Sequence, residues 1–231
     1  MSHPGEQSER ARSAILQRLR AAPVSAPAPA PDVAAYFASR PAIPAETRVA
    51  LFTANATGWH AEVIETTPTE WAATIAQVLA RKQLRRVLAG RNTALSAELA
   101  ATVDPATLAW YDEALPAFKP VLFNEIDAGI TTTRGGIAET GTLILWPGVD
   151  EPRTLSLVPP VHIAVLRASE LYDNFHQAMT AQSWAAQLPT NALLVTGPSK
   201  TADIQRLLVY GAHGPRELVI VLIRDDAGGE L

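Results

Sequence analysis

Residues 127–161 read DAGITTTRGGIAETGTLILWPGVDEPRTLSLVPPV. The stretch holds two apolar runs, a Gly-Gly pair, a Glu-Thr-Gly and a Pro-Pro that leads into a further apolar run. Glycine lets another backbone or a ligand approach closely, and threonine offers a hydroxyl on a side chain suited to strands. We therefore interpret the stretch as the floor of a binding site on an α/β scaffold, with Glu139 as a buried acid beside the glycines.

The composition describes a folded protein and excludes several functional classes. The chain has 231 residues, of which 48% are hydrophobic and 18% charged, so it can bury a sizeable core. A formal net charge of −4 gives no basic field for nucleic acid. Because there is no cysteine, this chain builds no disulfide, thiolate nucleophile, iron–sulfur cluster or Cys-ligated zinc site.

The sequence predicts neither a membrane span nor a secretory signal. No run of 18 apolar residues occurs, and the first 20 residues lack the apolar core of a signal peptide. We therefore expect a cytoplasmic protein.

The first 31 residues differ from the rest of the chain. Residues 5–20 predict a helix, because Ala11, Ala14, Ile15 and Leu19 recur at helical spacing among charges. A short apolar stripe of this kind needs a partner surface, on this protein or on a neighbouring subunit. Residues 22–32 read APVSAPAPAPD and predict an extended linker. We expect one α/β domain over residues 32–231.

The remaining chain alternates between helical and strand patterns, which predicts βαβ units and a largely parallel sheet. Consecutive strands within 128–146 predict an antiparallel insertion that makes the sheet mixed. Thr67 or Thr69 is expected to cap the helix predicted at 69–81, and Ser169 is expected to cap the helix predicted at 170–180. The predicted helices are 33–39, 69–81, 94–101, 121–126, 170–180 and 201–208; the predicted strands are 47–52, 62–65, 86–89, 108–111, 128–133, 136–146, 161–166, 192–196 and 217–223.

Four motifs follow one another in order along the second half of the chain. They are IAETGTLIL (137–145), SLVPPVHIAVL (156–166), TGPSKTADI (196–204) and GAHGPRELVIVLI (211–223). Together they resemble the signature of the lactate-utilisation C family (LutC/YkgG), which are LUD-domain proteins. The resemblance is strong over residues 117–224 and diffuse over residues 32–116.

The resemblance implies both a fold and a function. The implied fold is Rossmann-like, with a mixed sheet flanked by helices, similar to the NagB/RpiA/CoA-transferase group. The implied function is that of a subunit without iron–sulfur clusters, lacking independent activity, in a multi-component system that oxidises L-lactate to pyruvate. Two iron–sulfur proteins would then be the partners, and this chain itself binds no cofactor that its sequence reveals. The absence of cysteine agrees with this division of labour.

The segment GIAETGT (136–142) holds the candidate catalytic residue. A carboxylate beside glycines suits a general base, an acyl nucleophile or a ligand hydrogen bond, so Glu139 is a candidate for each role. The alternative is a buried Glu139 that accepts backbone N–H bonds and organises the turn. The neighbouring residues Gly135, Gly136, Thr140 and Gly141 are candidates for ligand contact, the glycines also for close backbone approach.

The segment TGPSKTADI (196–204) is the candidate anion site. A strand that ends before Gly197, followed by Ser199, Lys200 and Thr201 at the start of a helix, offers free N–H groups, hydroxyls and a cation to a phosphate or carboxylate. Ordinary capping of the helix by Ser199 or Thr201 is the alternative.

Three further residues are candidates for binding a small carboxylate or phosphate. His162 and His213 precede or begin apolar strands, and a histidine there is a candidate to donate to a carboxylate, although a structural hydrogen bond is the alternative for each. Arg153 has the planar fork that suits a carboxylate. The histidine spacings predict no metal site.

Two other functions stay open at this point. One is a stand-alone enzyme of the acyl-transfer or phosphosugar type that uses Glu139. The other is a metabolite-sensing scaffold protein without catalysis.

Overall fold

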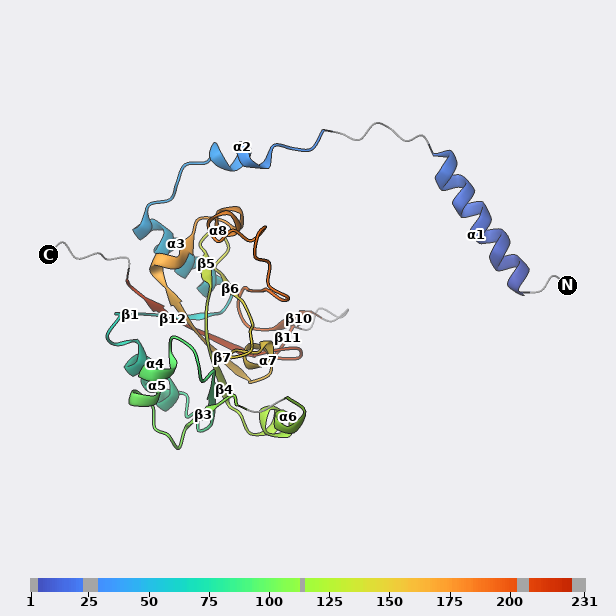
Figure 1. Ribbon diagram of the computed structural model, residues 1–231. Coiled ribbons are helices and arrows are strands. Elements are labelled where there is room, and N and C mark those ends of the chain that lie inside the picture. Colours follow the sequence, from blue (N-terminus) through green and yellow to red (C-terminus); the bar gives the residue numbers. More distant parts are fainter. Residues whose placement is uncertain (1–3, 23–28, 113–114, 203–207, 226–231) are drawn as a thin grey trace. The chain divides into compact units, whose positions relative to one another are not determined.

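The computed structural model describes residues 4–22, 29–112, 115–202 and 208–225 (Figure 1). The chain divides into two compact units, Met1–Pro41 and Ala42–Leu231. In the first unit, α1 (Pro4–Ala21) and α2 (Val33–Ala38) confirm the two predicted helices. The Asp32 carboxylate caps α2 by accepting from the Ala35 N–H at 2.9 Å. The predicted linker falls largely on residues 23–28, outside the described residues.

The second unit is built on a six-stranded sheet whose pairings are all parallel. The central strands are buried on both faces, as their unbroken apolar sequences predict. Every predicted strand except 47–52 and 136–146 lies close to an observed one. The strand order is β1 (Glu62–Thr66), β12 (Glu217–Ile223), β7 (Val161–Arg167), β4 (Ala128–Thr132), β2 (Val87–Ala89) and β3 (Leu108–Trp110).

Helices cover both faces of this sheet (Figure 1). On one face, α4 (Trp71–Arg81) and α5 (Ser96–Thr102) pack on the valines and isoleucines of the central strands. On the other face lie α3 (Ala45–Gly58), α6 (Leu115–Asn124) and α7 (Arg153–Leu157). The predicted α/β layer architecture is therefore confirmed.

The predicted antiparallel insertion is present, but it forms a separate sheet. Residues 136–146 are a hairpin rather than one strand, because Gly141 has a φ of +66° and turns the chain. Ile137 and Ile144 of the second sheet form a buried cluster with Ala178 of α8 (Phe175–Ala181) and with Trp184, which follows that helix. The strand order of the second sheet is β8 (Leu171–Tyr172), β5 (Gly135–Ile137), β6 (Thr142–Leu145) and β9 (Leu193–Val195).

The strand predicted at residues 47–52 is wrong, because these residues lie inside helix α3. The six letters TRVALF suit a strand by themselves. Over a longer window, Val49, Phe52 and Ala56 recur at spacings of three and four and are all buried on one side. The longer helical period therefore decides the structure.

Two predicted helix caps are also wrong. Helix α4 begins after Glu70, without a side-chain cap, and Thr67 donates to the Glu70 carboxylate at 2.8 Å. Ser169 does not cap a helix over 170–180, since residues 168–170 form the 3₁₀ turn η1 (Ala168–Glu170) and β8 follows. Asn174 caps the shorter helix α8 by accepting from Gln177 N–H at 2.9 Å.

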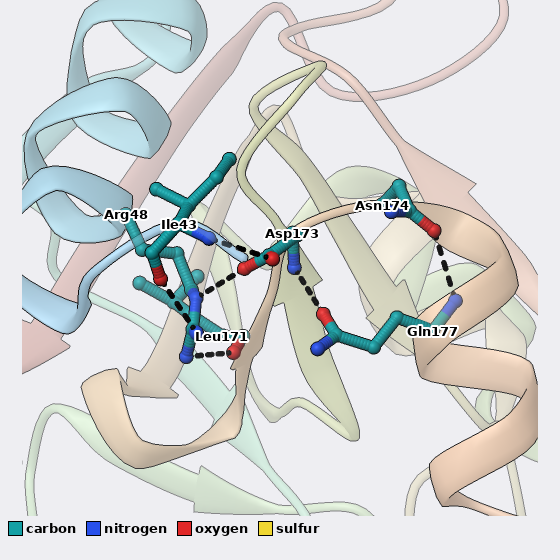
Figure 2. A network of polar contacts seen from close by, with 6 residues as sticks. All are labelled: Ile43, Arg48, Leu171, Asp173, Asn174 and Gln177. Carbon is teal, nitrogen blue, oxygen red and sulfur yellow. Dashed lines mark hydrogen bonds and ion pairs between the residues drawn. The ribbon is translucent and has the colours of Figure 1, made fainter. Parts of the chain in front are cut away.

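A polar network fastens α3 to the second sheet (Figure 2). Asp173 is 8% exposed, and its carboxylate accepts from Arg48 Nε at 2.7 Å and from the Ile43 N–H at 3.0 Å. Arg48 also donates to the carbonyls of Leu171, at 3.1 Å, and Ile43, at 3.0 Å. Buried charges are retained where they are paired and hydrogen-bonded, as the Asp173 carboxylate is by the partly exposed Arg48. Gln177 completes the network by accepting from Asp173 N–H at 2.6 Å.

Candidate functional site

Four of the predicted ligand residues meet at one cavity of about 230 Å³: His162, Gly197, Ser199 and His213. The cavity lies at the amino ends of β7 and β12 and is closed by α7, the end of β9 and the turn before β12. Its wall consists of Ser156, Leu157, His162, Leu194, Val195, Thr196, Gly197, Pro198, Ser199, His213, Gly214, Pro215 and Leu218.

Backbone contacts hold the two loops of the cavity together. Ser199 N–H donates to the Pro215 carbonyl at 2.7 Å, and Gly211 N–H donates to the Ser199 carbonyl at 2.9 Å. Gly197 has a φ of +82°, and a Cβ there would lie 2.3 Å from the Trp59 carbonyl oxygen. Only glycine suits that position, so this loop is fixed against the end of α3.

His162 forms the polar floor of the cavity. The residue is 1% exposed, and its Nε2 lies 2.8 Å from Thr131 Oγ1 on the neighbouring strand β4. Burial lowers the pKa of the His162 imidazole from 6.5 to about 4. The ring is therefore neutral at physiological pH and can offer a ligand a hydrogen bond, but no charge.

A chain of threonine hydroxyls connects the cavity with the β5–β6 hairpin. Thr196 lies on the cavity wall, and its Oγ1 is 2.6 Å from the Oγ1 of Thr142. The Oγ1 of Thr142 is in turn 2.7 Å from the Oγ1 of Thr140. Thr140 is therefore coupled to the cavity without lining it.

Glu139 does not lie in the cavity. It occupies the turn between β5 and β6, where its side chain is exposed, so the expectation of a buried acid is wrong. The turn lies against the end of α3, where Asn55 Nδ2 donates to the Ala138 carbonyl at 2.8 Å. From the sequence, residues 127–161 are expected to form the floor of the binding site. Of this stretch, Ser156 and Leu157 line the cavity.

Gly135, Gly136 and Gly141 of the hairpin lie so close to neighbouring atoms of the protein that a side chain there would clash. A Cβ at Gly135 would lie 2.5 Å from the Glu170 carbonyl oxygen, and one at Gly136 would lie 2.8 Å from a Leu171 methyl. A Cβ at Gly141 would lie 2.3 Å from the backbone nitrogen of Ala56 in α3. These contacts account for the glycines through packing alone.

The predicted helix start near Lys200 is wrong. Residues 200–202 form β10 (Lys200–Ala202), which pairs with β11 (Leu208–Tyr210), and residues 203–207 lie outside the described residues. The proposed anion site at a helix terminus is therefore lost. Lys200 is exposed, with Nζ 6.0 Å from the Trp59 ring centroid, and Thr201 pairs with Val209.

Arg153 is exposed at the first position of α7 and is not part of the cavity wall. A role for Arg153, Lys200 or Thr201 in binding stays a prediction. Across the described ranges, no group of three or more His, Asp or Glu side chains is arranged to hold a metal ion.

A second, more open hollow of about 400 Å³ shares Pro198 and Leu218 with the cavity. Lys82 on its wall is already paired, since Lys82 Nζ lies 3.0 Å from Glu62 and 2.8 Å from Glu217. An anion there would compete with two carboxylates, so the smaller cavity is the better candidate site.

The opposite, carboxyl edge of the sheet is where open α/β folds commonly bind ligands. Here Glu151 occupies it: its carboxylate accepts from Thr132 N–H at 2.9 Å and from the Thr132 hydroxyl. The loop that carries Asp150 and Glu151 also lies against Gly90, which follows β2. A Cβ at Gly90 would lie 2.4 Å from the Asp150 carbonyl oxygen. Residues 150–151 thus fill the crevice between the ends of β2 and β4.

Several cavity residues escaped prediction from the sequence. Ser156, Leu194, Pro215 and Leu218 carry no distinctive chemistry as letters. Thr131 was visible as part of a Thr-Thr-Thr run, but only the pairing of β4 with β7 places it against His162. The periodicity of a strand gives its face, not its neighbour in the sheet.

The parallel sheet between helical layers, with a cavity at its amino edge, defines a Rossmann-like α/β protein. The chain belongs to the LUD-domain family, whose model, described as "LUD domain", matches residues 49–223. The resemblance to LutC/YkgG proteins given by the four motifs is thereby confirmed.

Relatives with curated names are similar over different lengths. Lactate utilization protein C of Exiguobacterium is 31% identical over 176 residues, which cover 74% of this chain and 75% of the relative. An uncharacterized protein of Neisseria meningitidis is 49% identical over 117 residues, so the match spans half of each chain. Uncharacterized protein YkgG of Escherichia coli is 32% identical over 104 residues, 42% of this chain and 44% of the relative.

A solved structure supports the fold. A DUF162 family protein from Deinococcus radiodurans superposes with a TM-score of 0.58 at 20% sequence identity, covering 78% of this chain and 99% of that one. At this identity the likeness concerns the fold alone. Within the part of the chain that the structure describes, no helix has the length and apolar character to cross a membrane.

Proposed function

We propose that this chain takes part in lactate utilisation, as the subunit without iron–sulfur clusters of a cytoplasmic system that oxidises L-lactate to pyruvate. The observation that carries the proposal is its family membership, together with relatives called Lactate utilization protein C over about three quarters of their length. The oxidation releases two electrons. A chain without cysteine offers no thiolate ligands for clusters, so the partner proteins would carry them.

In this proposal the 230 Å³ cavity binds a small carboxylate. Its volume lies below the range of about 300–1,000 Å³ that is usual for drug-sized ligands, which suits a molecule with few heavy atoms. The apolar side chains of Leu194 and Leu218 would contact a methyl group, and His162 and Ser199 would bind oxygen atoms. Thus the cavity matches a short hydroxy acid or oxo acid in size and polarity.

The proposal is tested by affinity purification of the full chain from its native cells, followed by identification of partners and a dye-reduction assay. We expect cysteine-rich iron–sulfur proteins to co-purify, and the purified assembly to reduce the dye when L-lactate is added. The isolated chain should not do so. Co-purified cluster proteins without activity toward L-lactate would redirect the proposal to another oxidation substrate.

A stand-alone enzyme that uses Glu139 is the competing function, and its exposed position in a hairpin turn does not favour it. Turnover of an acyl-CoA or a phosphosugar by the isolated chain, abolished by Glu139→Gln, would replace the subunit proposal. In the lactate assay of the assembly, we expect Glu139→Gln to leave dye reduction unchanged.

A further inference from the structure

The buried His162 has one ring nitrogen with a protein partner and one without. Nε2 lies 2.8 Å from Thr131 Oγ1, whereas no group of the described residues forms a hydrogen bond with Nδ1. The residue is 1% exposed and borders the cavity. Nδ1 is not one of the fully enclosed side-chain atoms without a partner, so it faces the space of the cavity, where a ligand or water can bind it.

Thr131 determines which nitrogen carries the proton. A hydroxyl has one proton to donate, and His162 Nε2 is the one hydrogen-bond partner of Thr131 Oγ1 among the described residues. If the ring proton were on Nε2, the Thr131 hydroxyl proton would have no acceptor, although Thr131 is only 5% exposed. Donation from Thr131 Oγ1 to Nε2 leaves no such orphan. The neutral ring then carries its own proton on Nδ1.

We propose that Thr131 holds His162 as the Nδ1–H tautomer, and that this N–H donates to an oxygen atom of a small ligand in the cavity. The ligand class is a short 2-oxo or 2-hydroxy acid, which rests on the function proposed above. The tautomer itself rests only on hydrogen-bond geometry.

The other cavity residues agree with a ligand bound through neutral donors. Of the residues that form the described wall, none is an Asp, Glu, Lys or Arg, and Ser156 and Ser199 supply hydroxyls. Ser156 Oγ donates to the Arg153 carbonyl at 3.1 Å, so its lone pairs accept from a ligand hydroxyl. His162 is thus the buried donor for an acceptor oxygen.

The test is nuclear magnetic resonance of the full chain labelled with ¹⁵N-histidine, because the two ring nitrogens have distinct shifts in each tautomer. The signals that disappear in His162→Asn assign this residue among the five histidines. We expect the free protein to show Nδ1–H at pH 7, and pyruvate to shift that nitrogen on titration. L-Lactate is the second probe. Nε2–H in the free protein would overturn the proposal, as would Nδ1–H that neither probe shifts.

Three variants separate the hydrogen bond from the fold. Thr131→Val keeps the shape of the side chain, and we expect a mixture of tautomers and pyruvate affinity about two- to fivefold weaker, because affinity falls with the fraction of rings in the Nδ1–H form. His162→Asn keeps a donor near Nδ1, whereas His162→Gln keeps one near Nε2, so pyruvate should bind the Asn variant more tightly. Equal affinity of the Thr131→Val variant and the wild type would overturn the role of Thr131. The purification assay tests the lactate system separately, so either proposal can fail alone.

Discussion

At the scale of single residues, Glu151 is a partly buried carboxylate that forms no ion pair with any residue the structure describes. Burial raises the pKa of the Glu151 carboxyl, hydrogen bonds from Thr132 oppose the shift, and the charge of Asp150 adds to it. The folded state therefore binds this proton more tightly than the unfolded state. The contribution of Glu151 to stability is largest below the pKa of the unfolded chain and is lost as pH rises through the raised value.

Glu151→Gln should remove this pH dependence. Because Gln stays neutral and its carbonyl can accept from Thr132 N–H, we expect the variant to gain about 1 kcal/mol at pH 7.5, or roughly 2–4 °C in unfolding midpoint. The gain should shrink as pH falls toward 5. The difference in thermal unfolding midpoint between variant and wild type, from pH 5 to 8, measures this gain. Glu98 is exposed, so Glu98→Gln is the control for the loss of a charge alone. A gain that is constant across this range would contradict the assignment.

At the scale of elements, the hairpin between β5 and β6 is seated against α3. Asn55 Nδ2 donates to the Ala138 carbonyl at 2.8 Å, and Gly141 lies against the backbone of residues 55–56. The Arg48–Asp173 pair fastens the beginning of the same helix to β8 (Figure 2). Helix α3 packs on the first sheet and is also fastened to the second, so it joins the two sheets. Arg48 near its beginning and Asn55 near its end make the contacts with the second sheet.

Gly141→Ala should weaken this junction, whereas Gly148→Ala should not. At Gly141, a φ of +66° and a Cβ 2.3 Å from Ala56 N both oppose a side chain. We expect a loss on the order of 3 kcal/mol in the free energy of unfolding. Gly148 has nothing within 4 Å of a Cβ, so it is the matched control, with an expected change below about 1 kcal/mol. Urea unfolding measures the free energy of unfolding of both variants. Equal losses in the two would refute the close approach of Gly141 to the Ala56 backbone.

At the scale of the whole molecule, α1 carries an apolar stripe that the described part of its own unit does not cover. Ile15 is 59% exposed and Leu19 is 66% exposed. An isolated amphipathic helix of this length gains stability from a partner surface. Two partners follow from the sequence: the α/β domain of the same chain, or another subunit.

Replacing Ile15 and Leu19 together by Ser should distinguish these partners. If α1 binds another subunit, the variant should recover at least fivefold less iron–sulfur partner on affinity purification, while the thermal midpoint of the α/β domain stays within about 1 °C. Gln17→Ser, on an exposed position of the same helix, is the control. A lowered midpoint with full partner recovery would show instead that α1 packs on its own domain.

The sequence by itself determined the α/β class, the parallel sheet and the helices of the N-terminal unit. These follow from apolar periods of 2 and 3.6 residues and from unbroken apolar runs in strands buried on both faces, which are local properties. It also determined the family, because four motifs in order are specific as letters. It misassigned residues 47–52, 170–174 and 201–202, where a short window favoured the wrong period or the wrong cap.

The tertiary structure alone decided which candidates share a site. It joined His162, Gly197, Ser199 and His213 at one cavity and placed Glu139 in an exposed turn. The reason is physical: strand order and loop contacts bring together residues that are distant in sequence, and no local pattern encodes that order. Thr131 shows this most directly, since only the pairing of β4 with β7 gives its hydroxyl an acceptor on His162.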